Sequence, residues 1–397
     1  MTTPKTALVH EWLVGWGGSE SVLASFARLF PSAPIHTLVH VPDARVRDTF
    51  GSREIRTTWI HRLPGVERYY RYTLPLMPRA WHGVELGEVE LVLSSSHAFC
   101  KGVRVPDGAV HVCYCHTPPR YLWDLADGYR RGGTRGLSGP LLAWLRRRDL
   151  EDAANVDHFL ANSRFVAERV WRTYGRESTV VYPPVDVDAF PEPTGKGEYF
   201  LAGGRLVRYK RVDLAIRAAN LGRLPLVVFG DGPERLKLEA MAGASVSFVG
   251  SVSQRELVAL IRDAKAYLFP GIEDFGILPV EVQAGGRPVV ALAEGGALET
   301  VLEGETGALF SDATPEALLD AVTRLGTLGD VAPACRRNAA RFSRDRFEAS
   351  MRLELARVLD REGVGAGPGP RATALGRTTG TPQARSRRLP PGALGRD

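Results

Sequence analysis

Short apolar runs alternate with amphipathic stretches through the first half of the chain. Strands buried on both faces are predicted by such runs at 6–10, 35–40, 89–96, 109–116, 156–163 and 178–184. Helices are predicted at 19–30 and 163–175, where apolar side chains recur at helical spacing, with Ser163 as the N-cap and Gly175 as the stop of the second helix. Strands that alternate with helices predict a parallel sheet covered by helices.

The same alternation resumes after residues 181–198, a stretch rich in Pro, Asp and Gly that is typical of a linker. Further strands are predicted at 199–206, 225–232, 245–252, 266–270, 287–292 and 307–310, and further helices at 212–222, 254–264, 279–285 and 315–326. The fold class is therefore α/β, with two Rossmann-like domains that face each other across a cleft. Ligands of such sheets bind at the carboxyl ends of the strands, so the cleft is the expected site.

The domain limits follow from these patterns. We expect a first domain over 1–183, a linker over 184–198, a second domain over 199–340 and a C-terminal helix over 341–360 that returns to the first domain. Residues 361–397 contain few large apolar side chains and cannot offset their ordering entropy, so we expect a disordered basic tail.

The net charge of +6 is concentrated in the tail. Residues 361–397 hold seven Arg and two acidic residues, a net charge of +5, which leaves +1 for the rest of the chain. A nearly neutral folded body argues against a protein that binds nucleic acid over its whole surface. The N-terminus lacks the basic and apolar pattern of a secretory signal, and no apolar run approaches the roughly 18 residues of a membrane span, so we expect a cytoplasmic protein.

Four cysteines are too few for a disulfide framework in a chain of 397 residues. Cys113 and Cys115 alternate with their neighbours, which on a strand places both thiols on one face. Since no second Cys pair follows at zinc-ligand spacing, reduced thiols in a core are the preferred interpretation, with a metal site as the alternative.

The most distinctive local pattern is a pair of glutamates, Glu273 and Glu281, with seven residues between them. Pro279 suits the start of a helix, which places Glu273 in the loop after a strand and Glu281 in the first helical turn. A carboxylate there can chelate a ribose diol. A retaining glycosidase pair needs about 5 Å between its carboxyl groups, whereas even a fully helical path of eight residues spans about 12 Å. Two surface glutamates at a helix start remain the alternative.

Two loops carry groups suited to a diphosphate. Arg205 and Lys210 lie five residues apart in a loop between strand and helix. The planar guanidinium of the arginine and the compact ammonium of the lysine can converge there on a diphosphate. Gly17 and Gly18 precede the first helix and allow the backbone to approach a phosphate, although the spacing is not that of a nicotinamide fingerprint. A solvated basic loop and an ordinary glycine turn are the alternatives.

His116 follows a predicted strand and precedes two prolines, which hold it in an extended segment near the carboxyl edge of the sheet. A lone histidine is often structural, so a structural and a functional role both remain open at this point.

Together these motifs resemble the retaining glycosyltransferases of family 4, which have the GT-B fold. The resemblance runs from about residue 6 to about residue 350 and rests on GGSE, HTPPRYLWD, ANS, GGRLVRYKRVD, FGDGP, EDFGILPVEVQAGGRPVVA, GGALETV and GETGALF. The segment that begins HTPPRY is similar to that of a subgroup dominated by mannosyltransferases acting on polysaccharide or lipid-linked acceptors. One departure is Val185, where many relatives carry Asn or Gly, and we expect it to alter hinge stiffness.

The resemblance implies that the second domain binds the nucleotide sugar and the first lies on the acceptor side. Arg205 and Lys210 would hold the nucleotide diphosphate, and Gly17 and Gly18 would line it from the opposite domain.

Around the sugars, the resemblance implies that Glu281 binds the ribose hydroxyls and that Glu273 contacts a hydroxyl of the donor sugar, beside Phe275 and Gly276 as further donor-binding residues. His116 would lie beside the transferred sugar and contact its 6-hydroxyl, acting as an orienting hydrogen-bond donor and not as the main base.

The expected reaction moves a hexose from a nucleotide diphosphate to a hydroxyl with retention of configuration. Arg205, Lys210, Glu273 and His116 would form the catalytic group, without metal or other cofactor, since cationic side chains and a helix dipole can neutralise the leaving group. The Asp186-Val-Asp188 sequence is similar to a D-x-D metal motif, but its place in the linker keeps it from a diphosphate at the strand ends.

The donor inferred from the resemblance is GDP-mannose, and the acceptor is a saccharide or lipid-linked saccharide. A UDP-sugar donor and a catalytically silent sugar-nucleotide-binding protein are the alternatives. A silent protein should lack one of the charged residues of the donor site, and Arg205, Lys210, Glu273 and Glu281 are all present. A phosphorylase or epimerase is a further rival class, and a nicotinamide oxidoreductase lacks its glycine fingerprint.

Residues 120–148 hold seven Arg and two Asp, a net charge of +5, with interleaved Tyr, Trp and Leu. This composition is typical of a segment that contacts anionic lipid headgroups, which would place the protein on the inner face of the cell membrane. A solvated basic loop and helix on the first domain is the alternative.

Overall fold

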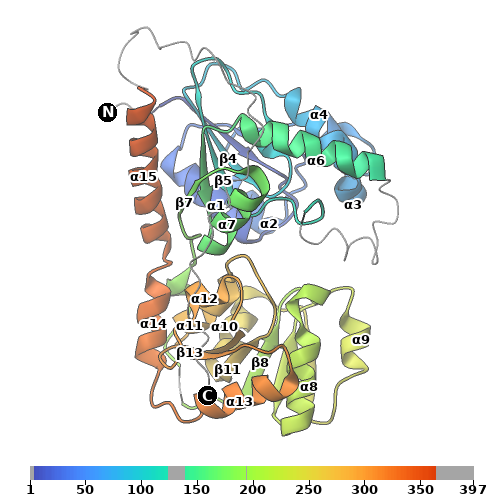
Figure 1. The fold of residues 1–397 in the computed structure, drawn as a ribbon, viewed down its shortest axis with the longest axis vertical. Helices are drawn as coiled ribbons and strands as arrows, with labels where there is room; N and C mark the ends of the chain where they lie inside the picture. The colour runs from blue at the N-terminus through green and yellow to red at the C-terminus, as the bar shows by residue number, and fades with distance from the viewer. Residues whose placement is uncertain (1–3, 124–138, 194, 364–397) are drawn as a thin grey trace, which may run out of the picture.

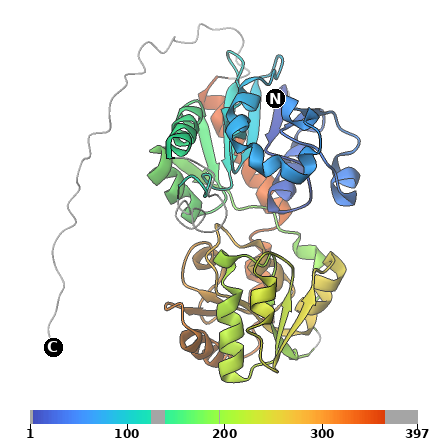
Figure 2. The same ribbon diagram turned by 90° about the vertical axis from the view of Figure 1, so that its right-hand side faces the viewer.

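Two α/β domains lie one above the other in the computed structural model, which describes residues 4–123, 139–193 and 195–363 (Figure 1). Every strand pair in both sheets is parallel. The predicted α/β class with two Rossmann-like domains is therefore confirmed, and Figure 2 shows the separation of the two lobes from the side.

The first domain is built on a seven-stranded sheet in the order β3-β2-β1-β4-β5-β6-β7. Its strands are β1 (Thr6–His10), β2 (Ile35–Thr37), β3 (Ile55–Thr57), β4 (Leu91–Ser96), β5 (Val110–Cys115), β6 (His158–Ala161) and β7 (Ser178–Val180). The predicted runs form these strands, except that β3 had no counterpart in the prediction.

Helices cover both faces of this sheet. They are α1 (Gly18–Leu29), α2 (Ala44–Phe50), α3 (Val66–Tyr69), α4 (Met77–His82), α6 (Gly139–Ala154) and α7 (Arg164–Tyr174). Helices α1 and α2 contribute to the core on one face, and α3, α4 and α6 to the core on the other. As predicted, α7 starts at Ser163, whose side chain accepts a hydrogen bond from the Val166 amide, and stops at Gly175 in the left-handed conformation.

The second domain has a six-stranded sheet in the order β10-β9-β8-β11-β12-β13. Its strands are β8 (Tyr199–Gly203), β9 (Leu226–Phe229), β10 (Val246–Gly250), β11 (Ala264–Phe269), β12 (Val289–Leu292) and β13 (Gly307–Phe310). Its helices are α8 (Val212–Gly222), α9 (Arg235–Glu239), α10 (Gln254–Asp263), α11 (Ile277–Ala284), α12 (Ala297–Thr300), α13 (Pro315–Leu325) and α14 (Ala332–Ala340).

The chain crosses between the domains twice. The linker crosses first, and α15 (Arg344–Arg361) then returns to lie along the first domain (Figure 1). At the crossing, the Val185 amide donates to the Phe342 carbonyl at 2.9 Å, so the two connections run side by side. The buried side chains of α15, among them Phe347 and Met351, belong to the same core cluster as Leu8 and Phe26.

Two expectations fall wholly or partly outside the described residues. The basic tail lies beyond residue 363, apart from the end of α15, and 124–138 of the basic segment 120–148 are likewise not described. Within the described part of the chain, no helix is both long and apolar enough to cross a membrane.

The contribution of α15 to the first domain can be tested with Phe347→Ala. Phe347 is 2% exposed, and its ring centroid lies 6.0 Å from that of Phe26 and 5.8 Å from that of Tyr114. We expect a loss of about 3–5 kcal/mol in the free energy of unfolding, measured by denaturant titration. Leu353→Ala, on the same helix but 53% exposed, is the control. Equal effects of the two variants would contradict the packing described.

Candidate functional site

An ion pair between Lys210 and Glu273 lies where two strand ends of the second domain meet. Lys210 belongs to the loop after β8 and Glu273 to the loop after β11, and Nζ lies 2.7 Å from Oε1. Burial lowers the pKa of Lys210, but the charge and hydrogen bond of Glu273 outweigh it and leave the pKa above its ordinary value. Two residues 63 positions apart in the sequence thus form one charged centre.

Close backbone approach makes this centre dependent on glycine. Gly204 has φ +103°, and a Cβ there would lie 3.2 Å from the Lys210 ammonium. A Cβ on Gly271 would lie 2.6 Å from Cα of Lys210. Side chains at either position would push the lysine away from Glu273.

Arg205 occupies the same loop as Lys210 but is exposed. In the described ranges it forms no ion pair, so its guanidinium remains available to an anion entering from solvent. It lies near enough to Tyr209 to lower the pKa of that phenol, although burial is the larger effect and raises it.

Glu281 lies further along its helix than the sequence predicts. Helix α11 begins at Ile277, so Pro279 is its third residue and Glu281 its fifth, and the predicted first-turn placement of Glu281 is wrong. The helix starts earlier because Gly276 adopts φ +86° and serves as the N-cap. Burial raises the pKa of Glu281 to about 7, opposed by Arg45 of the first domain and reinforced by Asp186 of the linker.

The glycine loop of the first domain touches the start of α11. Gly17 is the N-cap of α1, and a Cβ added to Gly18 would lie 2.5 Å from Cδ1 of Ile277. The predicted glycine pair and the predicted glutamate loop therefore meet across the cleft, although they belong to different domains.

The ring of Phe275, a residue that the resemblance implies to be donor-binding, lies in the protein interior. Its side chain is 3% exposed and packs in the core of the second domain, with ring centroids 5.8 Å from Tyr182 and 5.3 Å from Phe342. The ring is therefore committed to the packing near the interdomain crossing, and only the backbone of Phe275 faces the loop.

His116 lies at the carboxyl end of β5 on the first-domain side. Its Nε2 lies 2.8 Å from Ser95 Oγ, and its carbonyl accepts a hydrogen bond from Asn162 Nδ2 at 3.0 Å. Burial, and then the neighbouring His97 and His10, lower the pKa of His116 well below its ordinary value. The imidazole is therefore neutral at pH 7.

Asp274, the residue after Glu273, is a site residue that the sequence motifs did not predict. Its carboxylate pairs with Arg120 and Arg169, both from the first domain. Its carbonyl accepts a hydrogen bond from Ser163 Oγ at 2.6 Å. The loop that carries Glu273 is therefore held from the other domain, and the D in EDFG was the only sequence signal.

Two further contacts join the same loops across the cleft. The Arg120 guanidinium lies 5.2 Å from the ring centroid of Tyr209, next to Lys210. Glu299 of α12 accepts hydrogen bonds from the backbone amides of Arg164 and Phe165 at 2.9 and 3.1 Å, at the N-terminus of α7. The negative side chain meets the positive end of the helix, which favours the closed arrangement.

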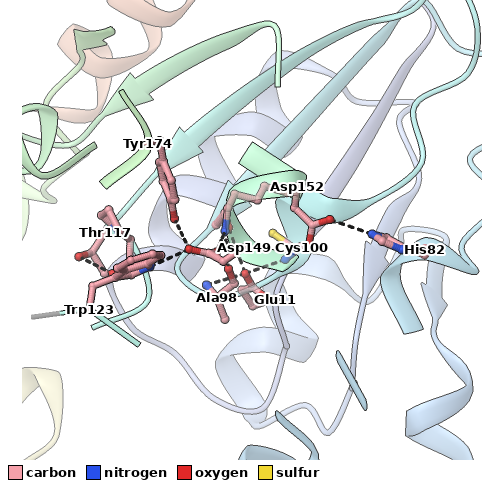
Figure 3. A network of polar contacts seen from close by, with 12 residues as sticks. Glu11, His82, Ala98, Cys100, Thr117, Trp123, Asp149, Asp152 and Tyr174 are labelled. Atoms are coloured by element: carbon pink, nitrogen blue, oxygen red, sulfur yellow. Dashed lines mark hydrogen bonds and ion pairs between the residues drawn. The ribbon is translucent and has the colours of Figure 1, made fainter. Parts of the chain in front are cut away.

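A buried polar network supports the segment that carries Arg120 (Figure 3). Asp149 of α6 is paired with buried Lys101 and accepts hydrogen bonds from Trp123 Nε1 at 2.8 Å and the Tyr174 hydroxyl at 2.9 Å. Because Trp123 is anchored in this way, the segment between His116 and Trp123 is fixed at both ends.

The remaining candidates are two cysteines and an aspartate of the linker. Cys113 and Cys115 are free thiols buried in a core cluster of β5 and α7. Asp186 lies 3.7 Å from Arg344 in the linker. Among the residues that the structure describes, no group of three or more His, Cys, Asp or Glu side chains is arranged to hold a metal ion.

The described part of the basic segment is engaged with the protein. Arg146 donates to the Leu122 carbonyl at 2.6 Å, and Arg147 and Arg148 both pair with Glu151. Trp144 on the same helix is 41% exposed.

Each half of the chain matches a family model. Residues 16–189 match glycosyltransferase family 4, and residues 187–342 match glycosyl transferases group 1. The boundary between the two matches coincides with the linker.

Curated relatives share about half of the chain. The D-inositol 3-phosphate glycosyltransferases of Mycobacterium bovis and Mycobacterium tuberculosis are 32% identical over 220 residues, which is 47% of this chain and 46% of theirs.

Solved structures match nearly the whole chain. Sucrose-phosphate synthase from Thermosynechococcus elongatus has a TM-score of 0.69 at 19% identity, covering 89% of this chain and 100% of that one. Anabaena HepE in complex with UDP and glucose has a TM-score of 0.64 at 16% identity, with the same coverage. The predicted GT-B fold is confirmed.

The bridge at Asp274 can be tested by Asp274→Asn. The neutral amide lacks the negative charge that contacts both guanidinium groups. We therefore expect the closed arrangement of the domains to be less stable by on the order of 3 kcal/mol, with a larger radius of gyration by small-angle X-ray scattering. Asp312→Asn, at an exposed position, is the control. Identical scattering of both variants and wild type would show that Asp274 does not hold the domains.

The environment of Glu281 predicts a pH dependence of stability. Its folded pKa of about 7 lies above the ordinary 4.5, so the folded state binds the proton more tightly and stability falls as pH rises from 4.5 to 7. We expect Glu281→Gln to remove a fall of about 2–3 kcal/mol in this window. The measurement is the unfolding midpoint against pH, with exposed Glu305→Gln as control. Parallel curves for wild type and Glu281→Gln would disprove the shift.

Proposed function

We propose, from a GT-B fold whose two halves match glycosyltransferase families, that this chain is a retaining glycosyltransferase. It moves a hexose from a nucleoside diphosphate donor to a hydroxyl of a saccharide or lipid-linked saccharide. The observation that carries the proposal is the Lys210–Glu273 ion pair, together with the approach of Gly18 from the other domain to Ile277, four residues after Glu273.

Charge complementarity supports a diphosphate in this crevice. Lys210 is largely buried and charged, and Arg205 is exposed with its guanidinium available. Cleavage of the bond to the sugar leaves negative charge on the diphosphate, which these two cations stabilise as it develops. Such fixed charges can serve in place of a metal, so we propose metal-independent transfer.

Two carboxylates are suited to accept hydrogen bonds from the hydroxyls of the donor sugar and the ribose. Glu273 projects from the same loop as Asp274 and is held beside Lys210, so it can accept from a hydroxyl of the donor sugar. Glu281 lies within electrostatic reach of the same tyrosine as Glu273, since both carboxylates raise the pKa of Tyr267, after burial itself. Glu281 is proposed to bind the ribose diol.

Retention follows from same-face attack. The acceptor hydroxyl approaches from the side of the departing diphosphate, and a phosphate oxygen takes its proton. His116, neutral and beside the cleft, orients the transferred sugar. The Asp274 bridge and the Glu299 contacts hold the domains together and exclude water while the sugar is activated.

The two candidate donors, GDP-mannose and a UDP-sugar, differ in their nucleotide base. Resemblance to the mannosyltransferase-rich subgroup favours GDP-mannose, whereas HepE, a protein of the same fold, was solved with UDP and glucose. Contact with an anionic membrane through residues 120–148 would suit a lipid-linked acceptor, and exposed Trp144 lies in that segment.

A thermal-shift panel of UDP, GDP and ADP tests the donor site. The nucleotide that fits should stabilise the protein by about 2.7 kcal/mol at a concentration 100-fold above its Kd. Lys210→Ala should abolish most of that stabilisation and lower kcat with the matching donor by about 10²–10³-fold, because it removes the charge that balances the leaving group. Lys237→Ala, an exposed lysine on α9, is the control. Near wild-type turnover of Lys210→Ala at saturating donor would refute the diphosphate clamp.

A further inference from the structure

Three polar residues share one face of the first sheet at its carboxyl edge. His10 ends β1, Ser95 lies near the end of β4, and His116 follows β5. His10 and Ser95 are direct partners in the parallel register of β1 and β4. Side chains two residues apart on a strand share a face, and His10 and His116 follow Leu8 and Tyr114 by two residues. Leu8 and Tyr114 lie in the core cluster that α1 covers, so the histidines lie on that face.

These residues form a continuous hydrogen-bonded chain that reaches the glycine loop. His116 Nε2 lies 2.8 Å from Ser95 Oγ, and Ser95 Oγ lies 3.1 Å from His10 Nδ1. His10 Nε2 lies 3.3 Å from Oε1 of Glu20, in the first turn of α1. His10 is fully buried and Glu20 is 6% exposed, so water does not compete along the inner half of the chain.

The chemistry of each member sets the direction of these bonds. An ionised carboxylate only accepts, so Glu20 requires the proton of His10 on Nε2. In a neutral imidazole the other nitrogen carries a lone pair, so Nδ1 of His10 then accepts from the Ser95 hydroxyl. The Ser95 oxygen, its only hydrogen already used, accepts from His116 Nε2–H.

The remaining nitrogen of His116 points away from the chain. Nδ1 has no hydrogen-bond partner among the residues described, and it retains contact with solvent. Glu11 forms no hydrogen bond with the chain: its Oε1 accepts from the amides of Ala98 and Cys100 at 2.7 and 2.9 Å, and its Oε2 has no hydrogen-bond partner among the described residues. His97 contacts the group through its ring, 6.1 Å from His116 and 6.4 Å from His10 between centroids.

We propose that Glu20, His10 and Ser95 are positioning residues that hold His116 in its Nε2–H tautomer, so that Nδ1 presents a lone pair to the cleft. His116 then accepts a hydrogen bond from a hydroxyl of the bound sugar, which reverses the donor role expected from the sequence. The identity of that ligand rests on the proposed function, whereas the tautomer does not.

The protonation states agree with this direction. Burial raises the pKa of Glu20, but hydrogen bonding, first of all with His10, outweighs it and leaves that pKa below its ordinary value, so the carboxyl is ionised. Burial also keeps His116 neutral, which leaves it a single ring proton.

The chain offers a matched control in the adjacent serine. Ser94 Oγ lies 2.8 Å from His111 Nε2, a second buried serine–histidine pair on the same two strands. Its partner His111 is fully buried and belongs to no part of the proposed site. Ser94→Ala therefore removes an equivalent bond without touching the chain that ends at His116.

The test is long-range ¹H–¹⁵N NMR of the ligand-free, ¹⁵N-histidine-labelled protein, with the His116 signals assigned from His116→Gln. We expect a protonated Nε2 and a lone-pair Nδ1 in wild type and in Ser94→Ala, and a mixture of tautomers in Ser95→Ala. A wild-type His116 with its proton on Nδ1, or in both tautomers, would overturn the proposal, and so would an unchanged tautomer in Ser95→Ala. If Ser95→Ala does not fold, the wild-type spectrum still decides.

Kinetics supply the second readout. Ser95→Ala should lower kcat by at least about tenfold while the thermal shift produced by the matching nucleotide stays unchanged, because only the orientation of the sugar is lost. Unchanged kcat in Ser95→Ala would overturn the role of the chain in sugar orientation. Absence of any nucleotide effect in wild type would refute the proposed function and leave the tautomer result standing.

Discussion

The geometry of the cleft depends on one carboxylate held between two guanidinium groups. Asp274 reaches from the second domain to Arg120 and Arg169 of the first, and its neighbour Glu273 is thereby held against Lys210. Charge pairs removed from water are stabilising only when both partners are present, so this bridge exists only in the closed arrangement. The position of the Glu273 carboxylate is in this way coupled to the contact between the two domains.

Parallel sheets supply the rest of the arrangement. Every strand ends at the edge that faces the cleft, so loops from distant parts of the sequence converge there. Glycines without side chains let those loops touch, as Gly204 does at Lys210 and Gly18 at Ile277. Histidine and serine at the ends of three adjacent strands then fall on one face without any local sequence motif.

Elements with a periodic apolar pattern could be predicted from the sequence, whereas irregular segments and contacts between distant elements could not. Apolar strands, the capped helix at Ser163 and the pairing of glycine loop with glutamate loop followed from spacing and resemblance. Residues 41–88 gave no signal because they form β3, the short helices α2 to α4 and a 3₁₀ helix over Tyr70–Leu76 that contains Pro75. Asp274 and His10 were missed because their partners lie in other elements.

The double crossing of the chain sets the order in which the molecule can be assembled. The first domain needs Phe347 and Met351 of α15 to complete its core, yet these residues follow the whole of the second domain in sequence. On the ribosome, the second domain is therefore fully synthesised before the first has all of its interior side chains. Until α15 is synthesised, the apolar side chains of the first domain that pack against Phe347 and Met351 lack these partners.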